Sequence, residues 1–140
     1  MNITIITIPE REQRYRTVGD WAVDRNGNIT IRVCECGDER FAFLLAAHEF
    51  VEAFLCKRAG VTTEQVDRYD LAHQEDDEPG LNPAAPYHQQ HMISFAVEIL
   101  LATALGVDWA EYNNALDAAW ERIPEAKASE EAENGSPTVP

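Results

Sequence analysis

The stretch LLAAHEFVEAFLCKRAG, from Leu44 to Gly60, has the apolar spacing of a long amphipathic helix. Its large apolar residues recur at steps of three and four, and a glycine such as Gly60 is typical of a helix C-terminus. His48 and Glu52 lie one turn apart on one face of this helix, and Glu49 lies next to His48. These three groups bind metal ions or transfer protons, so the stretch indicates both a fold element and a candidate site.

Short segments rich in β-branched residues precede this helix, at residues 2–8, 16–23 and 28–35. The last two flank Asp24 to Gly27, whose composition is typical of a hairpin turn. The helical spacing begins after Asp38, and further helices are expected at about 62–68, 87–105 and 109–123. The sequence therefore predicts an α+β domain over residues 1–123. In it, a small antiparallel β-sheet packs on two long helices and one shorter C-terminal helix.

Residues 124–140 are acidic and rich in small side chains. A segment of this composition cannot bury enough apolar surface to offset the entropy lost on ordering. We therefore expect these residues to form a disordered acidic tail.

The composition restricts the classes of partner. The chain of 140 residues carries a formal net charge of −14, which repels nucleic-acid phosphates and anionic membranes. Its N-terminus lacks the features of a signal peptide, and no apolar run is long enough to span a bilayer. Three cysteines are an odd number, which argues against a disulfide framework. We expect a cytoplasmic protein that acts on an unknown substrate and binds neither nucleic acid nor membranes.

A second group of potential metal ligands lies on the helix expected at 87–105. His88, His91 and Glu98 share one stripe of that helix. A catalytic metal site commonly uses three protein ligands and keeps one position open. We therefore expect His48, Glu52 and His91 to bind one metal ion, with His88 as an alternative or additional ligand. Asp70 and Glu98 remain further candidates. Zinc is the first expectation, with magnesium as the alternative.

A β-hairpin followed by a helix with His-Glu at its centre, and then by a helix with a further His, resembles the minimal plan of zincin-type metalloproteases. The layout matches over residues 21–98, and His48 and Glu49 match the motif itself. The resemblance implies that His48 binds zinc and that Glu49 is the general base of a metal-dependent hydrolase. Glu52 occupies the position of the second motif histidine and adds negative charge there. The chain also resembles small uncharacterised proteins of bacteria and phages.

Two other functions fit the same residues. Glu49 and Glu52 form an ExxE motif, and Glu64 and Asp67 form an ExxD motif. Together these motifs resemble the magnesium-binding carboxylates of nucleotide pyrophosphohydrolases, a family that is wholly helical. The other alternative is a non-enzymatic acidic binding module, which the net charge and the missing second histidine favour.

Overall fold

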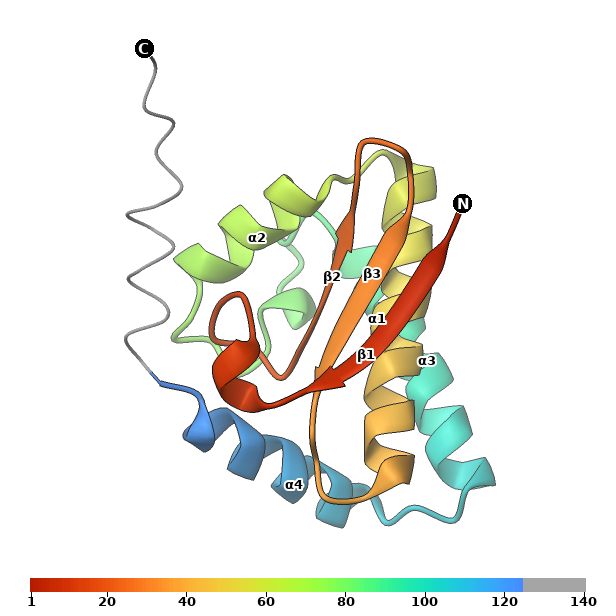
Figure 1. The fold of residues 1–140 in the computed structure, drawn as a ribbon, viewed down its shortest axis with the longest axis vertical. Helices are drawn as coiled ribbons and strands as arrows, with labels where there is room; N and C mark the ends of the chain where they lie inside the picture. Colours follow the sequence, from red (N-terminus) through yellow and green to blue (C-terminus); the bar gives the residue numbers. More distant parts are fainter. Residues whose placement is uncertain (125–140) are drawn as a thin grey trace.

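The structure is a computed structural model that describes residues 1–124, in which three strands precede four helices (Figure 1). The strands are β1 (Ile3–Ile8), β2 (Gly19–Val23) and β3 (Ile29–Cys34). The helices are α1 (Glu39–Ala59), α2 (Thr63–Ala72), α3 (His88–Ala104) and α4 (Trp109–Arg122). Two short 3-10 turns complete the elements, η1 (Glu10–Glu12) and η2 (Pro79–Leu81). The α+β class, the hairpin and the long helices are thus confirmed.

The sheet has the strand order β1-β3-β2, and β3 is its central strand. β2 and β3 form the expected antiparallel hairpin, whereas β1 pairs parallel to β3, with Ile3 opposite Ile29 and Ile8 opposite Cys34. The prediction of an antiparallel sheet is therefore wrong for β1, and the sheet is mixed. The connection at residues 9–18 carries the chain past the position of β3. The hairpin can then close with its buried, apolar strand in the centre.

Helix α1 packs against the sheet on one side and against α3 on another (Figure 1). Its N-terminus is capped by Asp38, whose carboxylate accepts a hydrogen bond from the Arg40 backbone N–H. Its C-terminus stops at Gly60, which has a φ of 76° and so adopts the left-handed conformation that glycine favours. Because α1 contacts both β2 and α3, the side that carries His48 and Glu52 is buried.

The remaining elements agree with the sequence in type and nearly in bounds. α2 is the expected short helix, and Thr62 and Gln65 form its capping box. All three cysteines are free and buried. None of the helices within residues 1–124 is both long and apolar enough to cross a membrane. The predicted disordered tail lies outside the described residues, except for Pro124.

Candidate metal centre

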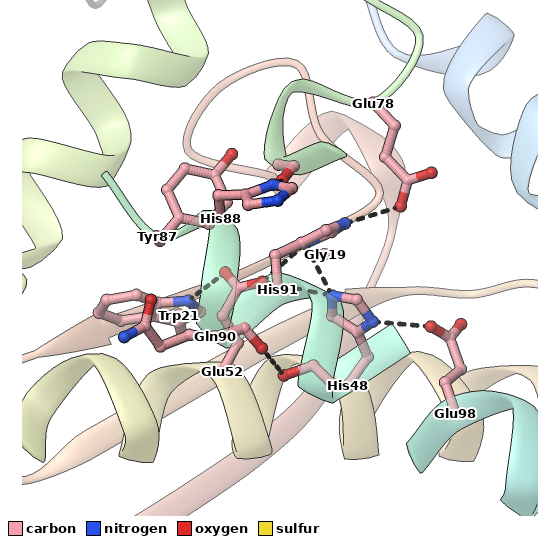
Figure 2. Close-up of polar contacts among 12 residues, drawn as sticks. Gly19, Trp21, His48, Glu52, Glu78, Tyr87, His88, Gln90, His91 and Glu98 are labelled. Atoms are coloured by element: carbon pink, nitrogen blue, oxygen red, sulfur yellow. Dashed lines mark hydrogen bonds and ion pairs between the residues drawn. The ribbon is translucent and has the colours of Figure 1, made fainter. Parts of the chain in front are cut away.

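Three buried side chains from two helices meet between α1 and α3 (Figure 2). His48 and Glu52 come from α1, and His91 comes from α3, which runs antiparallel to α1. His48 Nε2 lies 3.2 Å from His91 Nδ1 and 3.3 Å from Glu52 Oε2, and His91 Nδ1 lies 2.8 Å from Glu52 Oε2. Ligands of a tetrahedral zinc ion lie about 3.3 Å from one another. The three atoms can therefore hold a metal ion.

The hydrogen bonds of the two imidazoles identify which nitrogen of each ring is free to bind a metal ion between the three side chains. His48 Nδ1 lies 2.7 Å from Glu98, and His91 Nε2 lies 3.0 Å from Glu78. An ionised carboxylate only accepts hydrogen bonds, so both of these nitrogens carry the proton and donate it. The nitrogen lone pairs of neutral imidazoles then converge on the Glu52 carboxylate. Three electron-pair donors at these distances can hold a metal ion. In the metal-free protein, protons on the imidazoles can take this place, because the neighbouring carboxylates outweigh burial and raise the pKa of His48 and His91.

Outer partners orient the two side chains of the group that come from α1. Glu98 receives a hydrogen bond from His48 through one oxygen and one from the Tyr112 hydroxyl through the other. Glu52 Oε1 accepts a hydrogen bond of 3.0 Å from Trp21 Nε1, which leaves Oε2 for the group. A carboxylate behind a histidine ligand fixes the tautomer and increases the basicity of the ring. Glu98 is thus placed as a partner of His48 instead of a member of the group.

His91, the member of the group that comes from α3, is held by the turn η2. Gly80 lies so close to His91 that a Cβ atom there would be 2.4 Å from the ring, so this position excludes any larger residue. His88 Nδ1 lies 2.9 Å from the Gly80 carbonyl oxygen and donates to it. His88 therefore lies outside the group of three and anchors the turn that covers His91. Its expected role as an additional ligand gains no support from this placement.

A cavity of about 170 Å³ opens beside the group. His48, Glu52 and His91 line it together with Glu49, which follows His48 on α1. Among residues 1–124, no side chain donates a hydrogen bond to the Glu49 carboxylate. Burial and the neighbouring Glu52 raise the pKa of Glu49 well above its usual range. The group therefore lies next to a carboxylate that is able to accept a proton.

The wall of this cavity is strongly acidic. Its acidic residues are Asp20, Glu49, Glu52, Asp70, Asp77, Glu78 and Glu98. Within the described part of the chain, no lysine or arginine lines it. Such a wall repels anions and favours neutral or cationic ligands.

Other predicted site residues lie elsewhere. Asp70 lines the cavity, but its carboxylate accepts hydrogen bonds from Tyr15 and Tyr87 and stays apart from the group of three. Asp67 forms an ion pair of 2.8 Å with Arg14. Glu64 is exposed on α2. The carboxylates of the ExxD motif are therefore not brought together with those of ExxE.

Sequence reasoning missed several residues of the site. Nothing in the sequence around Trp21 and Tyr112 marks them as site residues, yet each donates a hydrogen bond to a carboxylate of the site. Glu78 is one of four consecutive acidic residues at 75–78, and no local signal distinguishes it from its neighbours. Gly80 lies in the turn η2, and no local signal marks it as a residue of the site. The contacts that define these four residues are all between distant segments, so no spacing rule identifies them.

Comparison of the chain with protein-family models, with curated protein sequences and with solved structures found no match. The fold and the site define the protein as an α+β protein with a buried His-His-Glu group that could hold a metal ion. The likenesses to zincins and to bacterial and phage proteins stay predictions.

The metal-free protein should lose stability as the pH rises from about 6.5 to about 9. Burial by itself lowers the pKa of His91, but the carboxylates of Glu52 and Glu78 outweigh it and raise the pKa to about 9. A group whose pKa is raised on folding stabilises the fold fully below its unfolded pKa of about 6.5, and this contribution is lost as the pH rises through the folded value. Urea unfolding of chelator-treated protein should show a loss of about 1–3 kcal/mol over this range.

His91→Gln is the control for this measurement, because it removes the titrating ring. Its stability should change less with pH than that of the parent. A parent protein whose stability is constant or increases over this pH interval would contradict the raised pKa of His91.

Proposed function

We propose that the protein is a zinc-dependent hydrolase in which His48, Glu52 and His91 bind the ion. The observation that carries the proposal is the convergence of two imidazole nitrogens and one carboxylate oxygen within 3.3 Å, beside a cavity. Two histidines and one glutamate also form the ligand set of known zinc hydrolases. Imidazole nitrogen suits zinc and other transition metals, whereas magnesium prefers oxygen ligands.

Glu49 is the proposed general base. It lines the same cavity as the ligands, and it lies against Gly19 of β2, where a Cβ atom would be 2.9 Å from Glu49 Oε1. A zinc ion bound there would act as a Lewis acid on the substrate carbonyl. Glu49 would take a proton from the attacking water and transfer it to the leaving group as the acyl bond breaks.

The acidic wall of the cavity supports an acyl substrate that is neutral or cationic. A nucleotide would bring several negative charges to a wall with seven acidic residues, of which Asp20 is paired with Arg14 from outside the lining, and no lysine or arginine is among the described lining residues. The separate positions of Glu64 and Asp67 also disfavour the pyrophosphohydrolase alternative. We therefore propose peptides, or other substrates with an amide or ester bond, as the substrate class.

Elemental analysis of protein purified without added metal tests this proposal. About one zinc per chain is expected, because the three ligands form a single site. Mass spectrometry of a peptide mixture should then show cleavage that a chelator abolishes and that zinc, but not magnesium, restores. Magnesium alone, or no metal, would contradict the zinc site. Bound zinc without cleavage of peptide, ester or nucleotide substrates would leave the binding module as the function.

A further inference from the structure

The outer face of the α1–α3 layer is apolar and uncovered by any described element. On α1, the residues Phe43, Ala47, Phe50 and Phe54 follow one another at steps of four, three and four. On α3, the residues Ile93, Val97, Leu100 and Ala104 have the same spacing. Residues at these steps form one stripe along a helix. Each of the eight is at least partly exposed, and Leu100 is 70% exposed.

The two stripes belong to one surface. α1 and α3 lie side by side and antiparallel (Figure 1). His48 and Glu52 mark the side of α1 that faces α3, and Leu45 and Glu49 mark the side that faces β2. The phenylalanine stripe falls on the remaining side of α1, and Phe43 at its N-terminal end also borders a groove that Ile5 and Thr7 of β1 line. We call the two stripes together the outer helix face.

The outer helix face lacks the charge that dominates the rest of the protein. Glu98 is the only Asp, Glu, Lys or Arg between residues 88 and 107, and it is buried against His48. A helix that is apolar on all sides is normally covered. Two chains with a net charge of −14 each repel one another, and an uncharged face is where they can approach at the lowest electrostatic cost.

We propose that a second copy of this chain covers the outer helix face, so that two α1–α3 pairs pack as four helices between two sheets. Each copy supplies the two antiparallel helices that half of a four-helix bundle requires. A two-fold axis brings identical apolar stripes together, which is the self-complementary arrangement of most homodimers. The proposal does not depend on metal binding or hydrolysis.

The size of the outer helix face agrees with a second copy of this chain as its partner. The 17 residues of α3 span about 25 Å, and two neighbouring helices are together about 20 Å wide. The footprint is then about 500 Å² per copy, or about 1,000 Å² in total, which is near the lower limit for a specific interface. We therefore expect a dimer that dissociates in the micromolar range.

Sedimentation equilibrium of the full chain tests the proposal. The parent should approach twice the chain mass of 15.7 kDa as its concentration rises from about 1 to about 100 μM. Ile93→Glu and Leu100→Glu should each weaken association about 100-fold or more, because a two-fold axis places two carboxylates in the interface. Both positions are exposed, so circular dichroism and melting temperature of the variants should match those of the parent monomer.

Ile6→Glu is the matched control. Ile6 is 40% exposed, close to the 45% of Ile93, but it lies on β1, away from the outer helix face. This variant should dimerise like the parent. A parent that stays monomeric at about 100 μM would overturn the proposal and assign the face to a different partner. If Ile6→Glu weakened association as much as Ile93→Glu and Leu100→Glu, the proposal would be overturned, and β1 would be the site of association. If Ile93→Glu or Leu100→Glu unfolds, the mass of the parent at about 100 μM still tests whether the chain dimerises.

Discussion

Replacing His91 by Ala should abolish zinc binding as completely as replacing His48. Each substitution removes one of three ligands, and the loss should exceed the 10- to 100-fold effect that is typical of outer-shell partners alone. Zinc affinity is measured by competition with a chromogenic chelator at constant pH. The structural basis is the distance of 3.2 Å between His48 Nε2 and His91 Nδ1, because it shows that residues of both α1 and α3 form the site.

His88→Ala is the matched control, because it removes an imidazole from the same end of α3. His88 donates to the Gly80 carbonyl and lies outside the group of three. Its loss should loosen the turn η2 and lower zinc affinity by less than about 10-fold. If His88→Ala loses zinc while His91→Ala retains it, the ligand set is wrong. If all three variants bind zinc like the parent, the metal lies elsewhere.

Glu49→Gln should retain zinc and lower the rate of hydrolysis by about 100- to 10,000-fold, the usual contribution of general-base catalysis. The amide has nearly the same shape as the carboxylate, but it cannot accept a proton from water. The ligand atoms of His48, Glu52 and His91 remain in place, so zinc affinity should change only slightly. The measurements are zinc content and the initial rate of peptide cleavage at saturating substrate.

Glu64→Gln separates this mechanism from the nucleotide alternative. Glu64 is exposed on α2, and the variant should match the parent in both zinc content and cleavage rate. Under the pyrophosphohydrolase alternative, Glu49 and Glu64 would both bind magnesium, and both substitutions would weaken that binding. Loss of metal from both variants would therefore reject the proposed function. Full activity of Glu49→Gln would reject Glu49 as the base and leave the metal site intact.

Local rules determined most of the secondary structure and two of the three residues of the candidate site. Asp38 and Gly60 mark the ends of α1 because a cap and a left-handed glycine act within a few residues of the helix end. The turn at Asp24 to Gly27 joins β2 and β3 for a similar reason. His48 and Glu52 are one turn apart on any helix, so their spacing alone predicted that they would act together.

The tertiary structure decided the parts that depend on distant segments. His48 and His91 are separated by 43 residues in the chain, and only the packing of α1 on α3 selects His91 over His88. The same packing places Glu98 behind His48 and brings Tyr112 of α4 to Glu98. The sequence favours His91 as the third ligand, but His88 lies only about one helical turn away, so the spacing leaves it open as an alternative or additional ligand.

The parallel pairing of β1 could not be predicted from the sequence either. The residue pattern of a strand does not show whether it pairs parallel or antiparallel to its neighbour. β1 and β3 pair parallel only because the connection at residues 9–18 carries β2 to the far side of β3. Trp21 then reaches Glu52 from β2, and the loop before α3 brings Glu78 and Gly80 to His91. The amino-acid sequence by itself determined the helices, the hairpin and the His48–Glu52 pair, because those rest on neighbours in the chain. The position of His91 and its surroundings depend on which faces pack together, and that is a property of the whole fold.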